Sequence, residues 1–274
     1  GNVNYNVAIG LESFLGGNLN TASTDVIGNI AIGAYALDAT STNAHTGTIA
    51  IGYQSLTSLT SGAGNTAVGY TAGTAINTGA GNTVIGYEAA LALTSAGSCV
   101  AIGREAMKLS SHDGSNNNIA IGYQSLDGLG STSAGDNIAI GSQALGATIT
   151  ADVKAIAIGT SALAALTSGS GNTAIGYQAG LTNTTGAANT YIGHSAAVDT
   201  HADATANVAV GKAAFGGAHG GTVSNYNTAV GEEAMGNGAV SGVDGATAIG
   251  FKALYALTSG ARNTAVGYQA LDAE

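Results

Sequence analysis

The sequence predicts an all-β protein, a repetitive parallel β-solenoid or β-roll of about fifteen coils of 17–20 residues. One short pattern that ends in Gly returns along the whole chain, which is the signature of a repeat architecture. Within this pattern β-branched residues alternate with small ones, as they do in a strand. The composition agrees, because 44 glycines, no proline and 8% charged residues suit neither a long helix nor collagen.

The repeat is aligned on a Gly that follows Ile or Val, which we call the anchor glycine. The clearest copy is GNTAIGYQAG at residues 171–180. After a first interval of 23 residues, successive anchor glycines lie 17–20 residues apart. The fifteen anchor glycines are Gly10, Gly33, Gly52, Gly69, Gly86, Gly103, Gly122, Gly141, Gly159, Gly176, Gly193, Gly211, Gly231, Gly250 and Gly267.

The residues before each anchor glycine predict one short strand. The residue directly before it is Ile or Val, the residue three before it is Val, Ile or Thr, and the residue between them is Ala in thirteen copies. Because one repeat cannot bury its own apolar face, we expect the coils to stack with parallel strands about 4.8 Å apart. We expect Ile85, Ile102, Ile175 and their equivalents to line the interior. The smooth Ala-rich second face is expected to pack against further copies of the chain.

Two columns of equivalent residues, one of Asn and one of Gly, are expected to support the stack of coils. Asn lies four residues before the anchor glycine in eleven copies, and stacked Asn side chains form amide ladders. The anchor glycine permits a sharp corner where a Cβ would clash. Representative members of the two columns are Asn65, Asn82, Asn172 and Asn189, and Gly69, Gly86 and Gly176.

The residues after the anchor glycine favour a short helical turn. The third is Ala or Ser, the fourth is apolar in thirteen copies, and several copies have another apolar residue three further on. Residues 104–109 are one example, and a short second strand is the alternative. The Thr, Ser, Gly and Asn that follow predict turns. The longest turns, Asn18–Asp25, His112–Asn117 and Gly216–Asn225, are expected to project and to carry any recognition.

The repeats run from end to end, which predicts a single repeat domain over residues 1–274 with fifteen coils and no separate caps. Solenoids protect their open edges with caps, so we expect a segment of a longer chain or copies that stack end to end. A net charge of −10 with six basic residues disfavours nucleic acid and anionic membranes as partners. The chain also lacks the run of about 18 apolar residues that spans a bilayer.

The Tyr residues that follow successive anchor glycines are the candidate ligand surface. Tyr53, Tyr70 and Tyr87 predict an aromatic stripe on which sugar rings could stack, and corner packing beside the glycine is the alternative. Glu88 and Glu105 occupy one repeat position in consecutive coils, and we interpret them as solvated surface rather than a catalytic pair. The five His and one Cys match no zinc spacing. The sequence therefore predicts no enzyme activity, no metal site and no cofactor.

These motifs resemble two families over residues 7–271. Repeats of the form GNTA[IV]GYQAL resemble those of bacteriophage tail-fibre-like proteins, and the core x-[TIV]-A-I-G is similar to the head repeat of YadA-type trimeric autotransporter adhesins. The resemblance implies a structural extracellular fibre or filament segment on a virion or cell surface, a rigid shaft or adhesin that presents loops for host attachment. It also implies a homo-oligomer, expected to be a trimer, with a cell-surface glycan or protein as receptor.

Three other functions remain open at this point. The chain is interpreted alternatively as the head of a bacterial trimeric autotransporter adhesin or as a self-stacking surface filament. The third is an ice-binding β-solenoid, since flat Thr arrays on such folds can match the ice lattice. Thr occupies the first strand position in only seven copies, which weighs against ice binding.

Overall fold

The structure of the chain, a computed structural model, describes residues 3–15, 26–39, 45–111, 114–130, 134–217, 222–237 and 242–272. These residues form strands and turns and no helix, so the described part of the protein is all-β, as predicted. It accordingly contains no helix long and apolar enough to cross a membrane. The chain divides into two compact units, unit 1 at Gly1–Asn137 and unit 2 at Ile138–Glu274.

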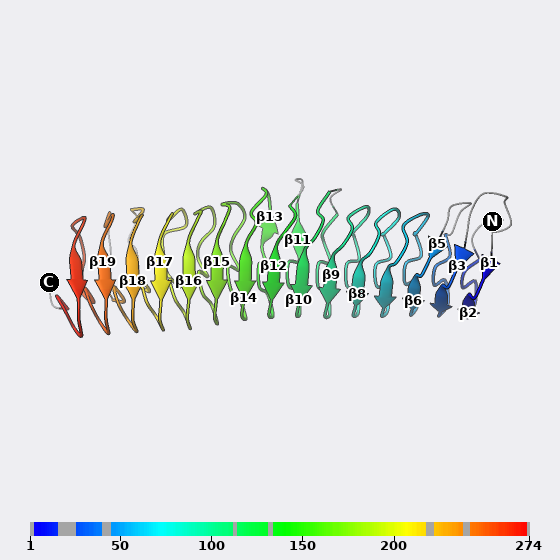
Figure 1. Ribbon diagram of the computed structural model, residues 1–274, viewed down its shortest axis with the longest axis horizontal. Helices are drawn as coiled ribbons and strands as arrows, with labels where there is room; N and C mark the ends of the chain where they lie inside the picture. The colour runs from blue at the N-terminus through cyan, green and yellow to red at the C-terminus, as the bar shows by residue number, and fades with distance from the viewer. Residues whose placement is uncertain are drawn as a thin grey trace. The chain divides into compact units, whose positions relative to one another are not determined.

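In unit 1 the residues before the anchor glycines form three-residue strands (Figure 1). These strands are β2 (Val7–Ile9), β4 (Ile30–Ile32), β6 (Ile49–Ile51), β7 (Thr66–Val68), β8 (Thr83–Ile85), β9 (Val100–Ile102) and β10 (Ile119–Ile121). The two-residue strands β1 (Val3–Asn4), β3 (Val26–Ile27) and β5 (His45–Thr46) form a second parallel sheet. The last strand of the unit is β11 (Gly128–Leu129).

Unit 2 repeats this arrangement. Its three-residue strands are β12 (Ile138–Ile140), β14 (Ile156–Ile158), β15 (Thr173–Ile175), β16 (Thr190–Ile192), β17 (Val208–Val210), β18 (Thr228–Val230), β19 (Thr247–Ile249) and β20 (Thr264–Val266). The strand β13 (Thr148–Ile149) has two residues.

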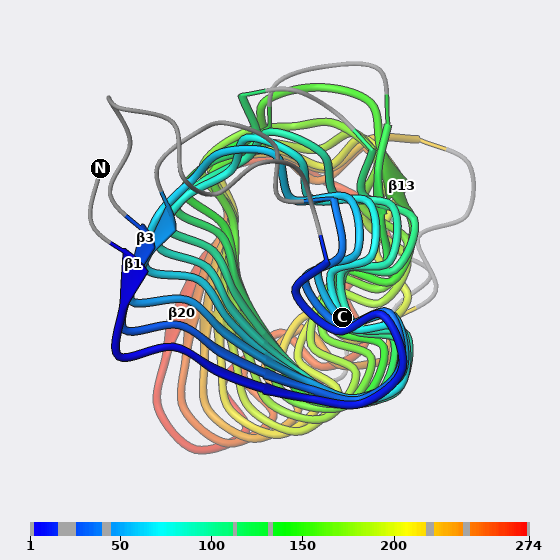
Figure 2. The same ribbon diagram turned by 90° about the vertical axis from the view of Figure 1, so that its right-hand side faces the viewer.

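Within each unit the strands pair in parallel and in the register that the repeat predicts. Ala50 lies opposite Ala67 in unit 1, and Ala157 lies opposite Ala174 in unit 2. The backbone of each coil makes one turn before it continues into the next coil (Figure 2). The predicted parallel β-solenoid is therefore confirmed.

The two faces of the strands are the reverse of the prediction. The central Ala points into the core, and the β-branched residues on either side of it point outward. Ile85 is 37% exposed and Ile175 is 38% exposed, and Ile102 is half-buried on the same face. The expected interior seam of Ile and Val, and the expected outer Ala face, are both wrong.

The physical reason is the narrow width of a coil. The core is filled from the turn segments by large side chains that are fully buried, among them Leu56, Leu59, Ile76 and Leu93. Across such a core the strand has room only for a methyl group, because protein interiors are packed without voids. Ala therefore takes the inward position, and the larger Ile, Val and Thr take the outward positions.

The segments after the anchor glycines are not helical, so the expected helical turn at residues 104–109 is wrong. The second and fourth residues after each anchor glycine have positive φ, for example Glu105 at 60° and Met107 at 53°. The N–H groups of these two positive-φ residues bond to the coils on opposite sides. The Gln54 amide donates to Ala34 O in the preceding coil at 3.0 Å, and the Leu56 amide donates to Ala72 O in the following coil at 3.1 Å. A helix would instead bond within its own segment.

The anchor glycines allow neighbouring backbones to come together. Gly69, Gly86 and Gly176 have φ of 144°, 141° and 138°, a region that L-residues rarely adopt. A Cβ on any of the three would lie 2.6–2.7 Å from the carbonyl carbon of the anchor glycine one coil further on. Glycine is therefore required at this corner both for the conformation of its own residue and for the approach of the next coil.

The Asn column forms a buried amide ladder. The backbone N–H and the side-chain Nδ2 of Asn82 both donate to Asn65 Oδ1, at 2.9 and 3.0 Å. Asn189 makes the same pair of bonds to Asn172 Oδ1, each at 3.0 Å. Each Nδ2 also donates to a turn carbonyl, as Asn189 does to Ala204 O at 2.7 Å. These buried amides thus link each coil to the coil before it and to the turn that follows.

Two departures from the repeat compensate each other. Gly180 stands where most copies have a large apolar residue, and Tyr191, eleven residues later, stands where most copies have Ala. A Cβ on Gly180 would lie 2.6 Å from Cδ2 of Tyr191, whose side chain is fully buried. The missing side chain makes room for the ring. Gly73 and Val84 are the only other pair of departures at these two positions, and they have the same separation in the sequence.

The first prediction concerns the corner. Gly176→Ala should lower the free energy of unfolding by about 3 kcal/mol or more, because strained φ and backbone overlap add together. Gly171→Ala in the same coil is the control, since its Cβ would meet nothing within 4 Å. Its positive φ alone should cost about 1–2 kcal/mol. Urea unfolding measures both, and equal losses for the two variants would contradict the close approach.

The second prediction concerns the amide ladder. Asn189→Asp should destabilise unit 2 more than Asn189→Ala at neutral pH, because a buried carboxylate would face Asn172 Oδ1 and Ala204 O. Burial raises the pKa of such an Asp, so the variant should regain stability as the pH falls and the group is protonated. Urea unfolding of both variants and the unchanged chain across the acid range tests this. An Asp variant as stable as the unchanged chain, or one without this pH dependence, would contradict it.

Candidate ligand-binding surface

The predicted Tyr stripe is a stack of aromatic rings in unit 1. Tyr53 and Tyr70 have ring centroids 5.2 Å apart with planes inclined by 16°, and Tyr70 and Tyr87 are 5.3 Å apart and inclined by 9°. All three side chains are exposed. Stacking arises because each follows an anchor glycine, so consecutive coils hold the rings at about one strand spacing. Their faces contact one another, and their edges are left to solvent.

Arg104 continues the stack at the next coil. Its guanidinium carbon lies 5.9 Å from the ring centroid of Tyr87 and 5.5 Å from that of Tyr123, both within cation–π range. We call Tyr53, Tyr70, Tyr87, Arg104 and Tyr123 the aromatic ladder. A guanidinium is flat enough to take the place of a ring, which explains how the ladder passes through a coil that has no Tyr.

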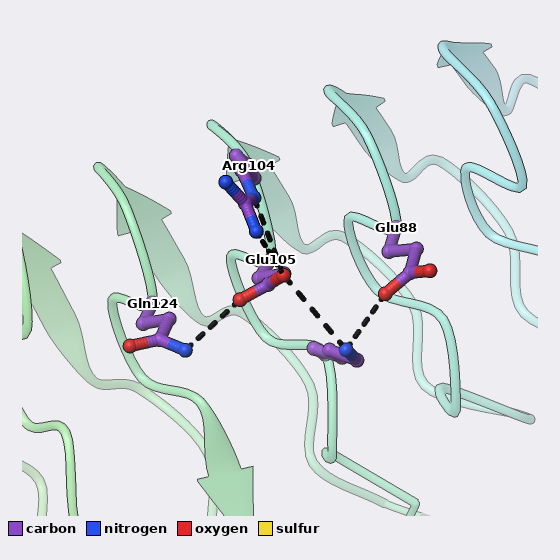
Figure 3. Close-up of polar contacts among 5 residues, drawn as sticks. Glu88, Arg104, Glu105 and Gln124 are labelled. Atoms are coloured by element: carbon purple, nitrogen blue, oxygen red, sulfur yellow. Dashed lines mark hydrogen bonds and ion pairs between the residues drawn. The ribbon is translucent and has the colours of Figure 1, made fainter.

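Arg104 also belongs to a cluster of charged side chains (Figure 3). Glu105 is only 7% exposed, so its carboxylate is held by donors on several sides. Arg104 Nη2 donates to Glu105 Oε1 at 3.2 Å, and Gln124 Nε2 donates to Oε2 at 2.9 Å. Lys108 Nζ lies 2.7 Å from Glu88 Oε2 and 3.9 Å from Glu105 Oε1. We call Glu88, Arg104, Glu105, Lys108 and Gln124 the charged cluster.

These contacts shift the pKa of several groups. The hydrogen bond from Lys108, together with one from Tyr87, lowers the pKa of Glu88. The same ion pair raises the pKa of Lys108, and the bond to Glu88 raises the pKa of the Tyr87 hydroxyl. Burial raises the pKa of Asp127, whose carboxylate is near enough to Lys108 to interact with it. Glu88 and Lys108 therefore remain a charged pair over a wide range of pH.

The ladder and the cluster meet at a surface hollow of about 400 Å³ lined by Tyr87, Glu88, Arg104 and Glu105. Volumes of this order are typical of small-molecule sites. Three kinds of group converge there, namely a phenol edge, two carboxylates and a guanidinium. The arrangement is suited to binding through several hydrogen bonds.

Unit 2 has shorter versions of the same features. Tyr177 stacks on His194 with centroids 4.9 Å apart, and Phe251 stacks on Tyr268 at 5.2 Å. Lys252 Nζ lies 5.3 Å from the Phe251 ring centroid. His194 is thus a packing variant at a Tyr position, in agreement with the sequence pattern. The continuous run of stacked groups from Tyr53 to Tyr123 belongs to unit 1.

Sequence reasoning placed some of these residues and missed others. It placed Glu88 and Glu105 in neighbouring coils but treated both as solvated, whereas Glu105 is buried against Arg104 and Gln124. It did not include Arg104 in the Tyr stripe. Aligning Arg104 with Tyr87 and Tyr123 by their distance from the anchor glycine would have revealed the shared column.

Other candidate residues have structural surroundings or lie outside the described part. Cys99 takes the place of an Asn in the ladder, where its amide donates to Asn82 Oδ1 at 3.0 Å, and burial raises the pKa of its thiol. The turn Asn18–Asp25 lies wholly outside the described residues, and so do residues 112–113 and 218–221 of the other two long turns. Across the described ranges, no three His, Cys, Asp or Glu side chains converge as a metal site would require.

No protein-family model matches the chain, and neither a curated protein nor a solved structure is significantly similar to it.

The third prediction concerns the ion pair at the edge of the hollow. Lys108→Met should raise the pKa of Glu88 toward its ordinary value, because the strongest bond to the carboxylate is lost. Carboxyl-carbon NMR titration measures this, and Lys154→Met, which removes the partner of Asp152, is the control. An unchanged Glu88 midpoint in the Lys108 variant would contradict the pairing.

The sign of the pH effect follows from the two shifts. A lowered Glu88 pKa gives stability that is present above the unfolded value of 4.5 and lost as the pH falls through the folded value. A raised Lys108 pKa gives stability that is present below 10.5 and lost as the pH rises through the folded value. The contribution is small because both side chains are partly in water.

Proposed function

We propose that the chain is a structural segment of an extracellular fibre, a rigid shaft that holds attachment surfaces away from a virion or cell. The observation that carries this proposal is the way the coils depend on one another. Within each unit, neighbouring coils are joined by hydrogen bonds of three kinds. They come from the strands, from the positive-φ residues after the anchor glycines and from the Asn column. A unit built in this way resists bending and local opening, because one coil cannot shift without breaking bonds to the coils on either side. The proposed role is mechanical and not enzymatic.

The outer face of the strands supports self-association. Each coil contributes two outward β-branched residues, and in unit 2 several of the second ones are exposed, including Ile175, Ile192 and Ile249. Monomeric proteins rarely leave a continuous apolar face of this kind in water. A second copy of the chain is the partner that fits it best, since only an identical solenoid repeats its apolar side chains at the same spacing along the whole face. We propose a homo-oligomer with cyclic symmetry, a trimer, with this face at its centre.

Attachment is the second part of the proposal. The motif resemblance to phage tail-fibre-like repeats favours a fibre that carries host-recognition surfaces, with a cell-surface glycan or protein as receptor. The alternatives within the same class are the head of a bacterial trimeric autotransporter adhesin and a self-stacking surface filament. All three use the same stacked coils and differ in what lies beyond them.

Ice binding is a second candidate function because the strand Thr residues face outward. From β15 to β20 of unit 2 the first outward position is Thr173, Thr190, Thr228, Thr247 or Thr264, with Val208 as an interruption, whereas β12 and β14 have Ile138 and Ile156 there. Flat columns of Thr beside Ile or Val are compatible with ordered water. Thermal hysteresis of the unchanged chain at micromolar concentration would favour this function over the oligomeric fibre.

The fourth prediction tests the oligomer. Light scattering of the unchanged chain should give three times the mass of one chain. Ile175→Lys combined with Ile192→Lys should weaken association about tenfold or more, because two charges would enter an apolar contact. Both side chains are partly exposed in the single chain, so the folded coil should survive with an unchanged circular dichroism spectrum.

The matched control is Ala188→Lys combined with Ala206→Lys. It adds the same two charges at a turn position that naturally holds Lys154 and Arg262. This control should keep the mass of the unchanged chain. A monomeric mass for the unchanged chain, or equal weakening in both double variants, would refute the proposed interface.

A further inference from the structure

We propose that the hollow lined by Tyr87, Glu88, Arg104 and Glu105 binds one uncharged unit of a saccharide chain. This inference rests on the proposed attachment function and adds to it a site and a ligand class. The site lies on the coil body of unit 1 rather than on a long turn. Its ligand would be a neutral hexose or N-acetylhexosamine with adjacent hydroxyl groups.

The polar groups of the hollow are held in place before any ligand binds. Arg104 Nε and Nη2 both donate to Glu105 Oε1, at 3.3 and 3.2 Å, while the guanidinium lies between two Tyr rings. Glu88 is fixed by Lys108 at 2.7 Å. Since these side chains are already ordered, a ligand that bonds to them avoids most of the entropic cost of fixing them.

The remaining hydrogen-bonding capacity of these groups matches hydroxyl pairs. The side chain of Arg104 is 64% exposed, so part of its guanidinium is free to donate. Lys108 and the Tyr87 hydroxyl use part of the accepting capacity of the Glu88 carboxylate, and its remaining lone pairs can accept from a ligand. A sugar hydroxyl donates and accepts at once, so two adjacent hydroxyls can accept from the guanidinium and donate to the carboxylate.

The charge balance favours an uncharged ligand. The charges of Glu88 and Glu105 are balanced by their ion-pair partners Arg104 and Lys108, so these four side chains together carry no net charge. The whole chain carries −10, which repels polyanions at long range. The two carboxylates at the hollow also disfavour a ligand carboxylate or phosphate, while the two cations disfavour an amine.

The aromatic ladder supplies an apolar wall. One face of the Tyr87 ring is covered by Tyr70 and the other by Arg104, so the edge and the hydroxyl border the hollow. The C–H groups of a sugar ring can pack against this edge while its hydroxyls reach the polar groups. The stacked faces of the ladder are not available to sugars between coils, which limits the site to the hollow.

The fifth prediction is the test of this site. Saturation-transfer NMR on the full chain should detect millimolar binding of neutral probes drawn from glucose, galactose, mannose, N-acetylglucosamine and their short oligomers. Glu88→Gln and Arg104→Gln should each weaken the best neutral probe about tenfold, as expected for loss of hydrogen bonds to a charged group. Glu232→Gln, which alters the exposed Lys212–Glu232 pair of unit 2, is the matched control and should change nothing.

Three outcomes would overturn the proposal. They are the absence of binding by every neutral probe, equal binding by the Glu88, Arg104 and Glu232 variants, and preference for sialyllactose or heparin fragments over every neutral probe. The mass measured by light scattering is independent of sugar binding. A trimer that binds no sugar therefore removes this site and leaves the structural role, whereas a monomer that binds sugar removes the interface and leaves the site.

Discussion

The close approach of neighbouring coils at the anchor glycines is the constraint on which the rest of the structure depends. The backbone turns there with φ near 130–144°, against the carbonyl of the next anchor glycine. Because the coils meet so closely, equivalent residues lie about one strand spacing apart. That spacing is what allows Asn amides to bond in a ladder and Tyr rings to stack. The conformations around each glycine are costly alone and persist because every coil repeats them.

Much of the fold could be predicted because residues at the same position in successive repeats are neighbours in a solenoid. The register of Ala50 on Ala67 and the bonds from Asn82 to Asn65 both follow from counting back from an anchor glycine. Two features could not be predicted in this way. Period-two alternation identifies the two faces of a strand but not which face is inside. The large side chains from the turn segments, on the other side of the core, leave room only for Ala. The spacing of apolar residues after the anchor glycine is the same in a helix and in the turn that the chain adopts, in which every second residue has positive φ. The pattern alone could therefore not distinguish the helix from this turn.

The reversal of the two faces changes the functional argument. Were Ile175 and its equivalents inside, the outer surface of the strands would be smooth and composed of Ala. With Ala inside, the outer face of the strands carries β-branched side chains, and the proposed contact between copies is placed on that face. The candidate site, too, could be predicted only in part. The Tyr column was visible in the sequence, but the hollow depends on Arg104 replacing a ring and on Glu105 being buried, which are properties of side-chain packing.

The in-register stack of coils is tested most directly by a distance within unit 2. Spin labels at Lys154→Cys and Arg262→Cys, in a Cys99→Ser background, would sit at equivalent turn positions of the coils that contain β14 and β20. Pulsed electron paramagnetic resonance, with labelled chain diluted in unlabelled chain, should give a narrow distribution near 29 Å, which is six strand spacings of about 4.8 Å. A broad distribution, or one centred at a much longer distance, would contradict the stacked coil.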